Sequence, residues 1–238
     1  MTILHTKRFS GWARGHLVCR VDDAVNRFAI TFDDGPNPRS TPAVLEVLAR
    51  HGARATFFLL GGNVRRHEDI ARRIVNEGHE PANHGDGHWP LPFLLPCGIR
   101  SHVLRGGQAI ESATAVKPRH YRPPFGFMAP GQSRFIRSLG YVSVLGDVYP
   151  EDAQRPGVDR IVRRVMARLR PGSILILHDG SPLGPADRGQ TVAALETILT
   201  EAEHRGWRAT TVADLLASAR PDISRPDKWA HPTKYLGR

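Results

Sequence analysis

Short apolar runs alternate with amphipathic segments along most of this sequence. The first runs, 28–30 and 55–60, are typical of buried strands. Between such runs the spacing changes, and Ile70, Ile74 and Val75 fall on one face of a predicted helix. The other predicted strands are 79–83, 120–124, 141–147, 173–179 and 207–212, and the predicted helices are 41–51, 67–77, 101–115, 131–139, 158–170 and 189–204.

This alternation gives about seven β-α units with short connections. Strands that alternate with helices in this way predict a parallel sheet with helices outside it. Because the alternation never pauses, we expect one barrel-like α/β domain over 21–219 rather than two domains. Residues 1–20 form an N-terminal extension without an assigned role, and the Pro-rich, charged segment 220–238 is predicted to be an irregular tail.

Polar side chains gather where the predicted strands end. Asp33 and Asp34 close the first strand, and two adjacent carboxylates there are costly unless a cation, a buried arginine or a shared proton accompanies them. They should point to opposite faces unless the strand already bends. In β/α barrels this end of the strands carries the active site. The residues at or just past the carboxyl ends are Asp33, Asp34, His84, Arg122, Asp147 and His178.

His84 and His88 are four residues apart, a spacing that can present two imidazoles to one ion. The Gly-Asp-Gly between them predicts a turn rather than a regular helix. In a chain with 12 histidines such a pair can be incidental, and an Asp-Asp-Gly-Pro stretch can be a plain surface turn. One Asp and two His together, however, make a ligand set that leaves positions open for water and substrate.

The large positive charge of the chain says little about its function. The formal net charge is +10, and most of it comes from arginines at helical spacings, as expected for solvated helix faces. The alternative is attraction to an anionic partner, such as a wall polymer or a phospholipid surface. The sequence lacks a zinc finger, an RNA-binding signature and a helix-turn-helix pattern, which argues against nucleic acid.

The two cysteines, Cys19 and Cys97, are too few for a disulfide framework, although one bridge is chemically open to them. The first eight residues carry no apolar stretch of signal-peptide length, and no run approaches the length that crosses a bilayer. We therefore expect a protein of the cytoplasm or of the inner membrane face, unless a leader has been trimmed from the sequence.

Four stretches in order carry a family resemblance. Thr-Phe-Asp-Asp-Gly-Pro at 31–36, Asn-His-x-x-x-His at 83–88, Arg-Pro-Pro-Phe-Gly at 122–126 and Leu-Ile-Leu-His-Asp at 175–179 resemble the motifs of the polysaccharide deacetylases. These are the NodB-type enzymes of carbohydrate esterase family 4, and the resemblance runs from about 27 to 216. It implies a distorted, NodB-like (β/α)7 barrel and removal of N- or O-acetyl groups from chitin, peptidoglycan, xylan and related glycans.

The resemblance also implies roles. Asp33 would be the base that activates a metal-bound water, and His178 the acid that protonates the leaving amine. Arg122 would steady Asp33, with Arg54 as a second candidate for that contact. The implied metal ligands are Asp34, His84 and His88, which suit zinc by default although cobalt, manganese or nickel could serve, and the implied oxyanion and substrate contacts are the Phe125 backbone N–H, Pro124 and Tyr149.

The sequence departs from the family after the fifth predicted strand. The family has an Asp followed by Trp, whereas residues 146–153 offer two aspartates and no Trp. Asp152 aligns with the usual aspartate, and Asp147 lies nearer the strand end, so both are candidate partners of His178. The missing Trp removes an apolar wall, which Tyr149 could replace, and leaves the acyl and sugar preferences open.

The predicted function is metal-dependent removal of N-acetyl groups from an N-acetylglucosamine glycan of the chitooligosaccharide or peptidoglycan type. The apolar loop 89–96 follows the histidine pair and either packs over the barrel mouth or forms a lip for sugar or lipid. A lip would favour a deacetylase or deformylase of a lipid-linked sugar precursor. A third alternative is a catalytically silent, glycan-binding barrel, against which the retained Asp33, Asp34 and histidines argue.

Overall fold

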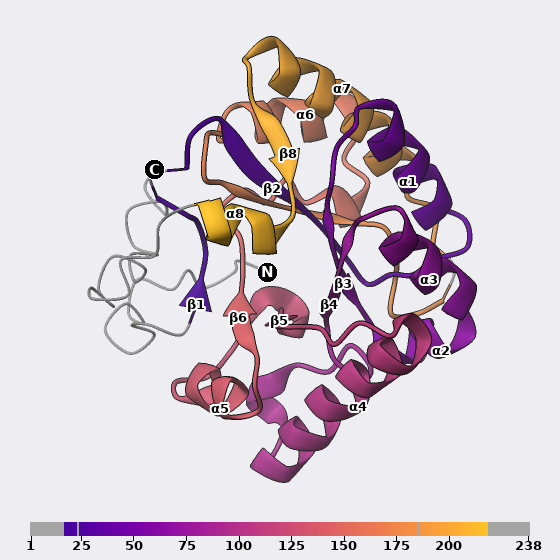
Figure 1. The fold of residues 1–238 in the computed structure, drawn as a ribbon, viewed down its shortest axis with the longest axis vertical. Coiled ribbons are helices and arrows are strands. Elements are labelled where there is room, and N and C mark those ends of the chain that lie inside the picture. The colour runs from indigo at the N-terminus through magenta and orange to yellow at the C-terminus, as the bar shows by residue number, and fades with distance from the viewer. Residues whose placement is uncertain (1–16, 23, 185, 219–238) are drawn as a thin grey trace.

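A curled parallel sheet forms the centre of the molecule (Figure 1). The computed structural model describes residues 17–22, 24–184 and 186–218. The strands are β1 (Leu17–Val18), β2 (Arg27–Asp33), β3 (Thr56–Leu59), β4 (Glu80–Asn83), β5 (His120–Tyr121), β6 (Val142–Val144), β7 (Ile174–His178) and β8 (Arg208–Thr210). Within the described residues they make one eight-stranded sheet in the order β1-β6-β5-β4-β3-β2-β7, with β8 paired to β2, and every pair is parallel. The predicted parallel α/β sheet is confirmed.

The sheet curls until its two ends nearly meet. Beyond β6, Val148 forms a single parallel bridge to Leu175 of β7, and Ile176 N donates to Val148 O at 2.9 Å. In a closed barrel a full strand would pair with β7 at this position, whereas here the pairing is limited to one residue. The barrel is therefore distorted, and the segment after β6 lies beside the first residues of β7.

Helices cover the outside of the sheet (Figure 1). Strand β2 shows why: Phe28, Ile30 and Phe32 face the helices in the main core, while Ala29 faces inward with Phe58. A strand buried on both faces is typical of parallel sheets. The helices are α1 (Thr41–Arg50), α2 (Gly61–Arg66), α3 (Glu68–Asn76), α4 (Pro96–Thr114), α5 (Gln132–Ser138), α6 (Val158–Met166), α7 (Gly189–His204) and α8 (Val212–Ser218), with 3₁₀ turns η1 (Leu91–Phe93), η2 (Pro124–Gly126) and η3 (Asp152–Gln154).

Some elements differ from those expected. The last residues of the expected extension 1–20 contribute β1 to the sheet, α4 begins at Pro96 rather than 101, and the glycines that close β3 begin the unpredicted helix α2. Gly61 is there because its backbone approaches two others: its N–H donates to Gly85 O at 2.8 Å, and a Cβ would lie 2.9 Å from the Cα of Gly106. Residues 1–16 and the predicted tail 220–238 lie outside the described residues.

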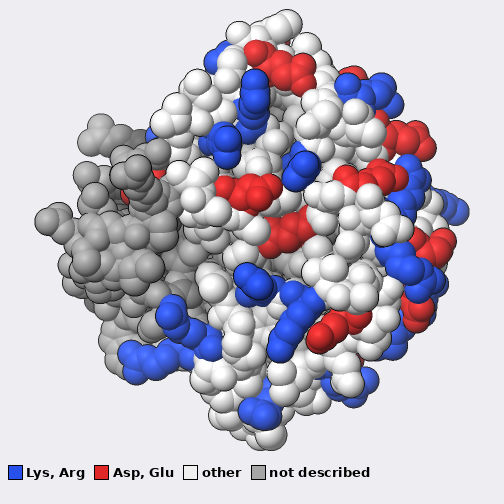
Figure 2. Space-filling model, in the orientation of Figure 1, with Lys and Arg blue, Asp and Glu red and all other residues white. Residues whose placement is uncertain are grey.

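The basic side chains are interspersed with acidic ones along the edge formed by α1, α2 and α3 (Figure 2). On α3, Arg72 pairs with Glu68, and Arg73 pairs with Glu77, at helical spacing. These contacts match the solvated helix faces predicted from the sequence. Within the described ranges, no helix is long and apolar enough to span a bilayer. Cys19 and Cys97 are both free thiols.

Candidate active site and metal centre

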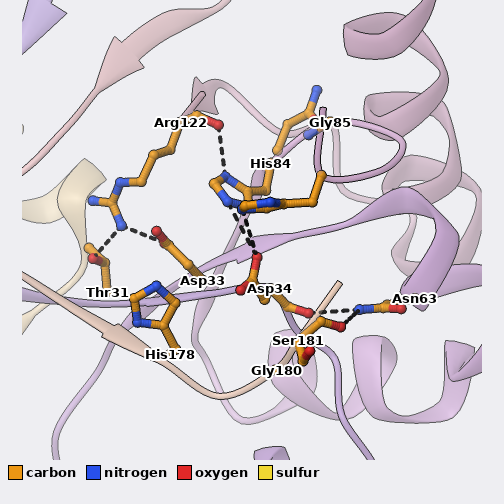
Figure 3. A network of polar contacts seen from close by, with 12 residues as sticks. Thr31, Asp33, Asp34, Asn63, His84, Gly85, Arg122, His178, Gly180 and Ser181 are labelled. Atoms are coloured by element: carbon orange, nitrogen blue, oxygen red, sulfur yellow. Dashed lines mark hydrogen bonds and ion pairs between the residues drawn. The ribbon is translucent and has the colours of Figure 1, made fainter. Parts of the chain in front are cut away.

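The strand ends bring the predicted polar residues together (Figure 3). Asp33 is in register with His178 of β7 on one side and with Phe58 of β3 on the other. His84 follows β4, where its N–H donates to Leu59 O at 2.9 Å, and Arg122 follows β5. Parallel strands in register place these side chains at one end of the barrel.

The strand bends between the two aspartates. Strand β2 ends at Asp33, and Asp34 takes a φ of 72°, in the left-handed region that Asp tolerates better than most residues. The bend cancels the alternation of a regular strand, so both carboxylates face the site (Figure 3). Asp33 is directed toward Arg122, whereas Asp34 is directed toward the histidine pair.

Asp34, His84 and His88 could hold a metal ion, because one ligand atom from each lies within 4.8 Å of the others. Asp34 Oδ1 is 3.6 Å from His84 Nε2 and 3.4 Å from His88 Nε2. Two ligands of a tetrahedral zinc at bond lengths of about 2.0–2.1 Å are about 3.4 Å apart. Asp34 Oδ1 is also buried without a hydrogen-bond partner among the described residues. An orphaned buried carboxylate oxygen facing two imidazoles fits a divalent cation.

The histidines are prepared as ligands. His84 Nδ1 lies 2.8 Å from Arg122 O, and because a carbonyl can only accept, Nδ1 carries the proton and Nε2 is left with its lone pair. Burial lowers the pKa of His88 against the opposing charge of Asp34, which favours its neutral form. Neutral imidazole is the form that binds a metal.

The turn between the two histidines is held from outside by α2 and α4. Asp86 Oδ1 accepts from Arg65 at 2.6 Å, and Asp86 Oδ2 lies 3.1 Å from Arg105 Nη2. Gly85 has a φ of 91°, and a Cβ at this position would overlap the buried His102 side chain. The predicted non-helical turn is therefore fixed by two ion pairs and by a glycine that no other L-residue can replace without strain.

Asp33 forms a buried ion pair with Arg122. Arg122 Nη1 donates to Asp33 Oδ1 at 2.6 Å and to Thr31 Oγ1 at 2.7 Å, and its remaining nitrogens donate to the carbonyls of Val144 and Leu145. Burial raises the pKa of the Asp33 carboxyl, but the Arg122 guanidinium, together with His84 and His178, holds the pKa below its usual range. The second carboxylate oxygen, Oδ2, is not engaged by Arg122.

His178 is paired with Asp152. His178 Nδ1 lies 2.9 Å from Asp152 Oδ1, and His178 N–H donates to Asp152 Oδ2 at 2.9 Å. Burial lowers the pKa of His178, but the carboxylates of Asp152, Asp33 and Asp34 together outweigh it and raise the pKa to about 9. Asp147, the other candidate, instead accepts from the backbone N–H of Ile174 at 2.8 Å, at the opposite end of β7. The structure thus brings Asp152, and not Asp147, to His178.

Aromatic side chains line the entrance. The Phe125 ring lies 4.2 Å from His88, between centroids, and Phe125 follows the buried Pro124 in η2. The Tyr149 ring lies 6.0 Å from His178 on the other side. Burial raises the pKa of Tyr149 to about 12, which keeps its hydroxyl protonated. Tyr149 therefore lies beside the predicted acid.

The loop 89–96 is partly packed against the barrel and partly exposed. Leu91 is fully buried in a small cluster with Ile99, and Gln132 of α5 donates to Leu91 O at 2.9 Å. Phe93 and Leu95, in contrast, are 82% and 73% exposed. The loop is anchored through one leucine and presents an apolar lip to solvent.

Sequence reasoning missed the residues that support these side chains. Asn63 donates to Asp34 O at 2.7 Å, and Thr191 Oγ1 donates to Asp152 Oδ2 at 2.8 Å. Arg188 binds the backbone beyond both His178 and Asp152. Polar residues at helix starts look like ordinary caps, so no signal in the pattern marked them. Arg54, the second candidate contact of Asp33, lies near His79 before β3, away from the site.

Comparison with known proteins agrees with this arrangement. Residues 20–144 match the family model described as polysaccharide deacetylase. A chitooligosaccharide deacetylase of Bradyrhizobium sp. (strain ANU 289) is 42% identical over 186 residues, covering 75% of this chain and 85% of that protein. This chain belongs to the polysaccharide deacetylase family. A second family member, a peptidoglycan-N-acetylglucosamine deacetylase of Bacillus cereus, is 36% identical over 204 residues, covering 85% of this chain and 93% of that protein.

Solved structures of the family share the fold. A peptidoglycan N-acetylglucosamine deacetylase superposes with a TM-score of 0.82 at 27% identity, covering 89% of this chain and 97% of that one. The NodB-like (β/α)7 barrel expected from the sequence is thereby confirmed. A pseudoenzyme of carbohydrate esterase family 4 from Bacillus anthracis superposes with a TM-score of 0.79 at 27% identity, covering 87% of this chain and 71% of that one. The fold of the polysaccharide deacetylases therefore does not by itself separate active from silent members.

Proposed function

We propose that this polysaccharide deacetylase hydrolyses the N-acetyl group of N-acetylglucosamine units in a chitooligosaccharide or peptidoglycan glycan. The observation that carries the proposal is the convergence of three metal-ligand atoms, the Asp33–Arg122 pair and the His178–Asp152 pair at one end of the barrel. The names of the relatives support the substrate class.

Asp34, His84 and His88 would hold one divalent cation, with zinc favoured by the donor set and cobalt, manganese or nickel also suited to it. When bound, such an ion lowers the pKa of water and polarises an acyl carbonyl. The tautomer of His84 and the low pKa of His88 keep both nitrogens ready for it. The role of these residues is to bind and orient.

Asp33 would act as the base. Arg122 occupies Oδ1, so Oδ2 accepts the proton of the attacking water, whose oxygen forms a bond to the acetyl carbon. The charge that develops on the carbonyl oxygen needs a donor, and the candidate is the backbone N–H of Phe125, whose ring lies beside His88. Arg122 keeps Asp33 ionised and therefore competent as a base.

His178 would act as the acid. The bond between the acetyl carbon and the sugar nitrogen breaks, and His178 Nε2 delivers a proton to that nitrogen, which leaves as the amine. Because Asp152 accepts at Nδ1, Nε2 is the nitrogen left for this transfer. The products are acetate and a free amino sugar. With its pKa raised to about 9, His178 is protonated at neutral pH, as an acid must be.

The decisive experiment is acetate release from N-acetylglucosamine oligomers by the purified protein. It is run with zinc or cobalt, with a chelator, and with Asp33→Asn against the matched control Asp159→Asn, whose side chain is on an exposed face of α6. We expect release that needs metal and Asp33 and survives in the control. Metal binding without release would overturn the substrate, and absence of both would favour a glycan-binding barrel.

A second candidate substrate is a lipid-linked sugar precursor, acetylated or formylated. Phe93 and Leu95, exposed on the loop that follows the histidine pair, favour it, because exposed apolar side chains often contact apolar partners. The double substitution Phe93→Ser with Leu95→Ser should then reduce activity on a lipid-linked substrate and spare a soluble oligomer. Leu183→Ser, which removes a 96% exposed leucine outside the lip, is the control. Equal loss on both substrates would refute this candidate.

A further inference from the structure

Arg188, at the start of α7, is a buried cation that binds backbone carbonyls. Only 8% of it is exposed. Its Nε and Nη2 both donate to Gly180 O, at 2.9 and 2.8 Å, and its Nη1 donates to Ala153 O at 3.0 Å. Across 17–22, 24–184 and 186–218, no ion pair joins it to an acidic side chain. A buried cation without a carboxylate partner is costly, so its retention calls for a physical reason.

The two carbonyls belong to the two segments that carry the predicted acid and its partner. Gly180 lies two residues beyond His178 at the end of β7. Ala153 directly follows Asp152 in η3. The guanidinium therefore spans the gap between these segments. The same helix adds a further contact through Thr191, which donates to the Asp152 carboxylate.

The segment after His178 also touches the metal side of the site. A Cβ on Gly180 would overlap Asp34 O, and Asn63 donates to both Asp34 O and Ser181 O, at 2.7 and 3.3 Å (Figure 3). This segment is therefore fixed on one face by the backbone of a metal ligand. Arg188 fixes it on the other face, against the segment that carries Asp152.

We propose that Arg188 is a positioning residue for deacetylation: its guanidinium sets the separation between the backbone segments of His178 and Asp152, and so holds the His178 imidazole where it delivers its proton. The inference rests on the proposed function, in which His178 is the acid. A planar fork with several fixed donors can bind two carbonyls at once, which the single ammonium of a lysine cannot do in the same geometry.

The test compares Arg188→Gln and Arg188→Lys with the intact protein. The control is Arg155→Gln, because Arg155 belongs to the same region but is exposed and pairs with Asp187 at the surface. We expect kcat to fall about 10- to 100-fold in Arg188→Gln, as for a displacement near 1 Å, with KM and bound metal nearly unchanged. Arg188→Lys should not restore kcat, and Arg155→Gln should behave as the intact protein.

A second readout does not need activity. The carboxylates that face His178 are Asp152 from the segment after β6, Asp33 at the end of β2 and Asp34 directly after it, and the Tyr149 ring lies 6.0 Å away. The three carboxylates together outweigh burial and raise the pKa of His178 to about 9. In metal-free Arg188→Gln, followed by NMR titration, loosening of the Asp152 contact should lower the pKa of His178. Unchanged titration together with unchanged kcat would overturn the proposal. A fall in kcat that is fully explained by loss of bound metal or by loss of stability would overturn it as well.

The two readouts separate this inference from the proposed function. If the intact protein released no acetate, the proposed function would fail, and the His178 titration would still decide whether Arg188 positions the pair. If Arg188→Gln did not fold, Arg188→Lys, which keeps the cation and the stem but not the fork, would carry both measurements.

Discussion

The buried pair between Arg122 and Asp33 allows a quantitative prediction for the substitution Arg122→Met. Methionine keeps an apolar stem of similar length over Phe58, whose ring centroid lies 4.0 Å from the guanidinium carbon. It removes the donors to Asp33 and Thr31 and leaves the Asp33 carboxylate buried without a cation. The substitution therefore isolates the loss of charge and donors from the loss of packing.

The magnitude follows from burial. Arg122 is 1% exposed and Asp33 is 5% exposed, so water cannot replace the lost partner. Removing one member of a buried ion pair typically lowers the free energy of unfolding by about 3–5 kcal/mol, because the other charge stays unpaired. We expect a loss in that range at pH 7 for Arg122→Met. The double variant with Asp33→Asn should recover part of it, since the remaining side chain is then neutral.

The loss of stability in Arg122→Met should depend on pH. In the intact protein the pKa of Asp33 is lowered on folding, so its contribution is present above the unfolded pKa and is lost as the pH falls through the folded pKa. In Arg122→Met the pKa of Asp33 should rise, because Arg122 is gone and only His84 and His178 still oppose burial. The difference between the variant and the intact protein should therefore shrink toward acidic pH.

Urea unfolding of metal-free protein between about pH 4.5 and 8 measures these differences, since free energies follow from linear extrapolation. The full cycle uses the intact protein, Arg122→Met, Asp33→Asn and the double variant. A coupling energy below about 0.5 kcal/mol, the range of additive sites, would refute the reasoning. A difference that stayed constant with pH would show that packing, and not charge, dominates the cost.

Three further outcomes follow from the site. In Asp152→Asn the pKa of His178 should fall below about 9, so the basic limb of kcat/KM should move to lower pH; an unmoved limb would assign it to another group. Gly85→Ser should weaken metal binding by about tenfold or more, the scale of a disturbed ligand environment, because the serine side chain would overlap His102. Titration calorimetry on this variant, with and without a compensating His102→Ser change, tests the prediction. A metal affinity equal to that of the intact protein would contradict it. Removal of metal by a chelator should lower the melting temperature of the intact protein and leave that of Asp34→Asn nearly unchanged, as calorimetry would reveal, whereas equal shifts would place the bound ion elsewhere.

Periodicity was sufficient for strands β2 to β8 and for most helices, because burial on both faces of a strand gives an apolar run and a half-buried helix has one apolar stripe. Helix α2 was not predicted, because its two glycines look like the end of a strand. A glycine is required at position 61 only because Gly85 and Gly106 approach it closely in the folded protein. Strand β1 was not predicted, because a strand of two residues is too short to show an alternation of apolar and polar positions.

For the site, the sequence by itself determined the residue types and their order. Asp33 and His178 end strands, Asp34, His84 and Arg122 directly follow strands, and His88 lies in the turn after β4. It left open which aspartate partners His178, because both Asp147 and Asp152 fall after the same strand. Only the tertiary structure decided for Asp152, since the chain turns through η3 and returns its carboxylate to the end of β7.

The tertiary structure likewise decided that both carboxylates of the Asp-Asp pair face the site. A regular strand would have separated them, and the left-handed backbone at Asp34 reverses that expectation. Supporting residues such as Asn63 and Arg188 act through backbone carbonyls of segments distant in the chain. Their hydrogen bonds exist only after those segments meet, so a pattern along the chain determined the reacting groups and the folded geometry determined what holds them.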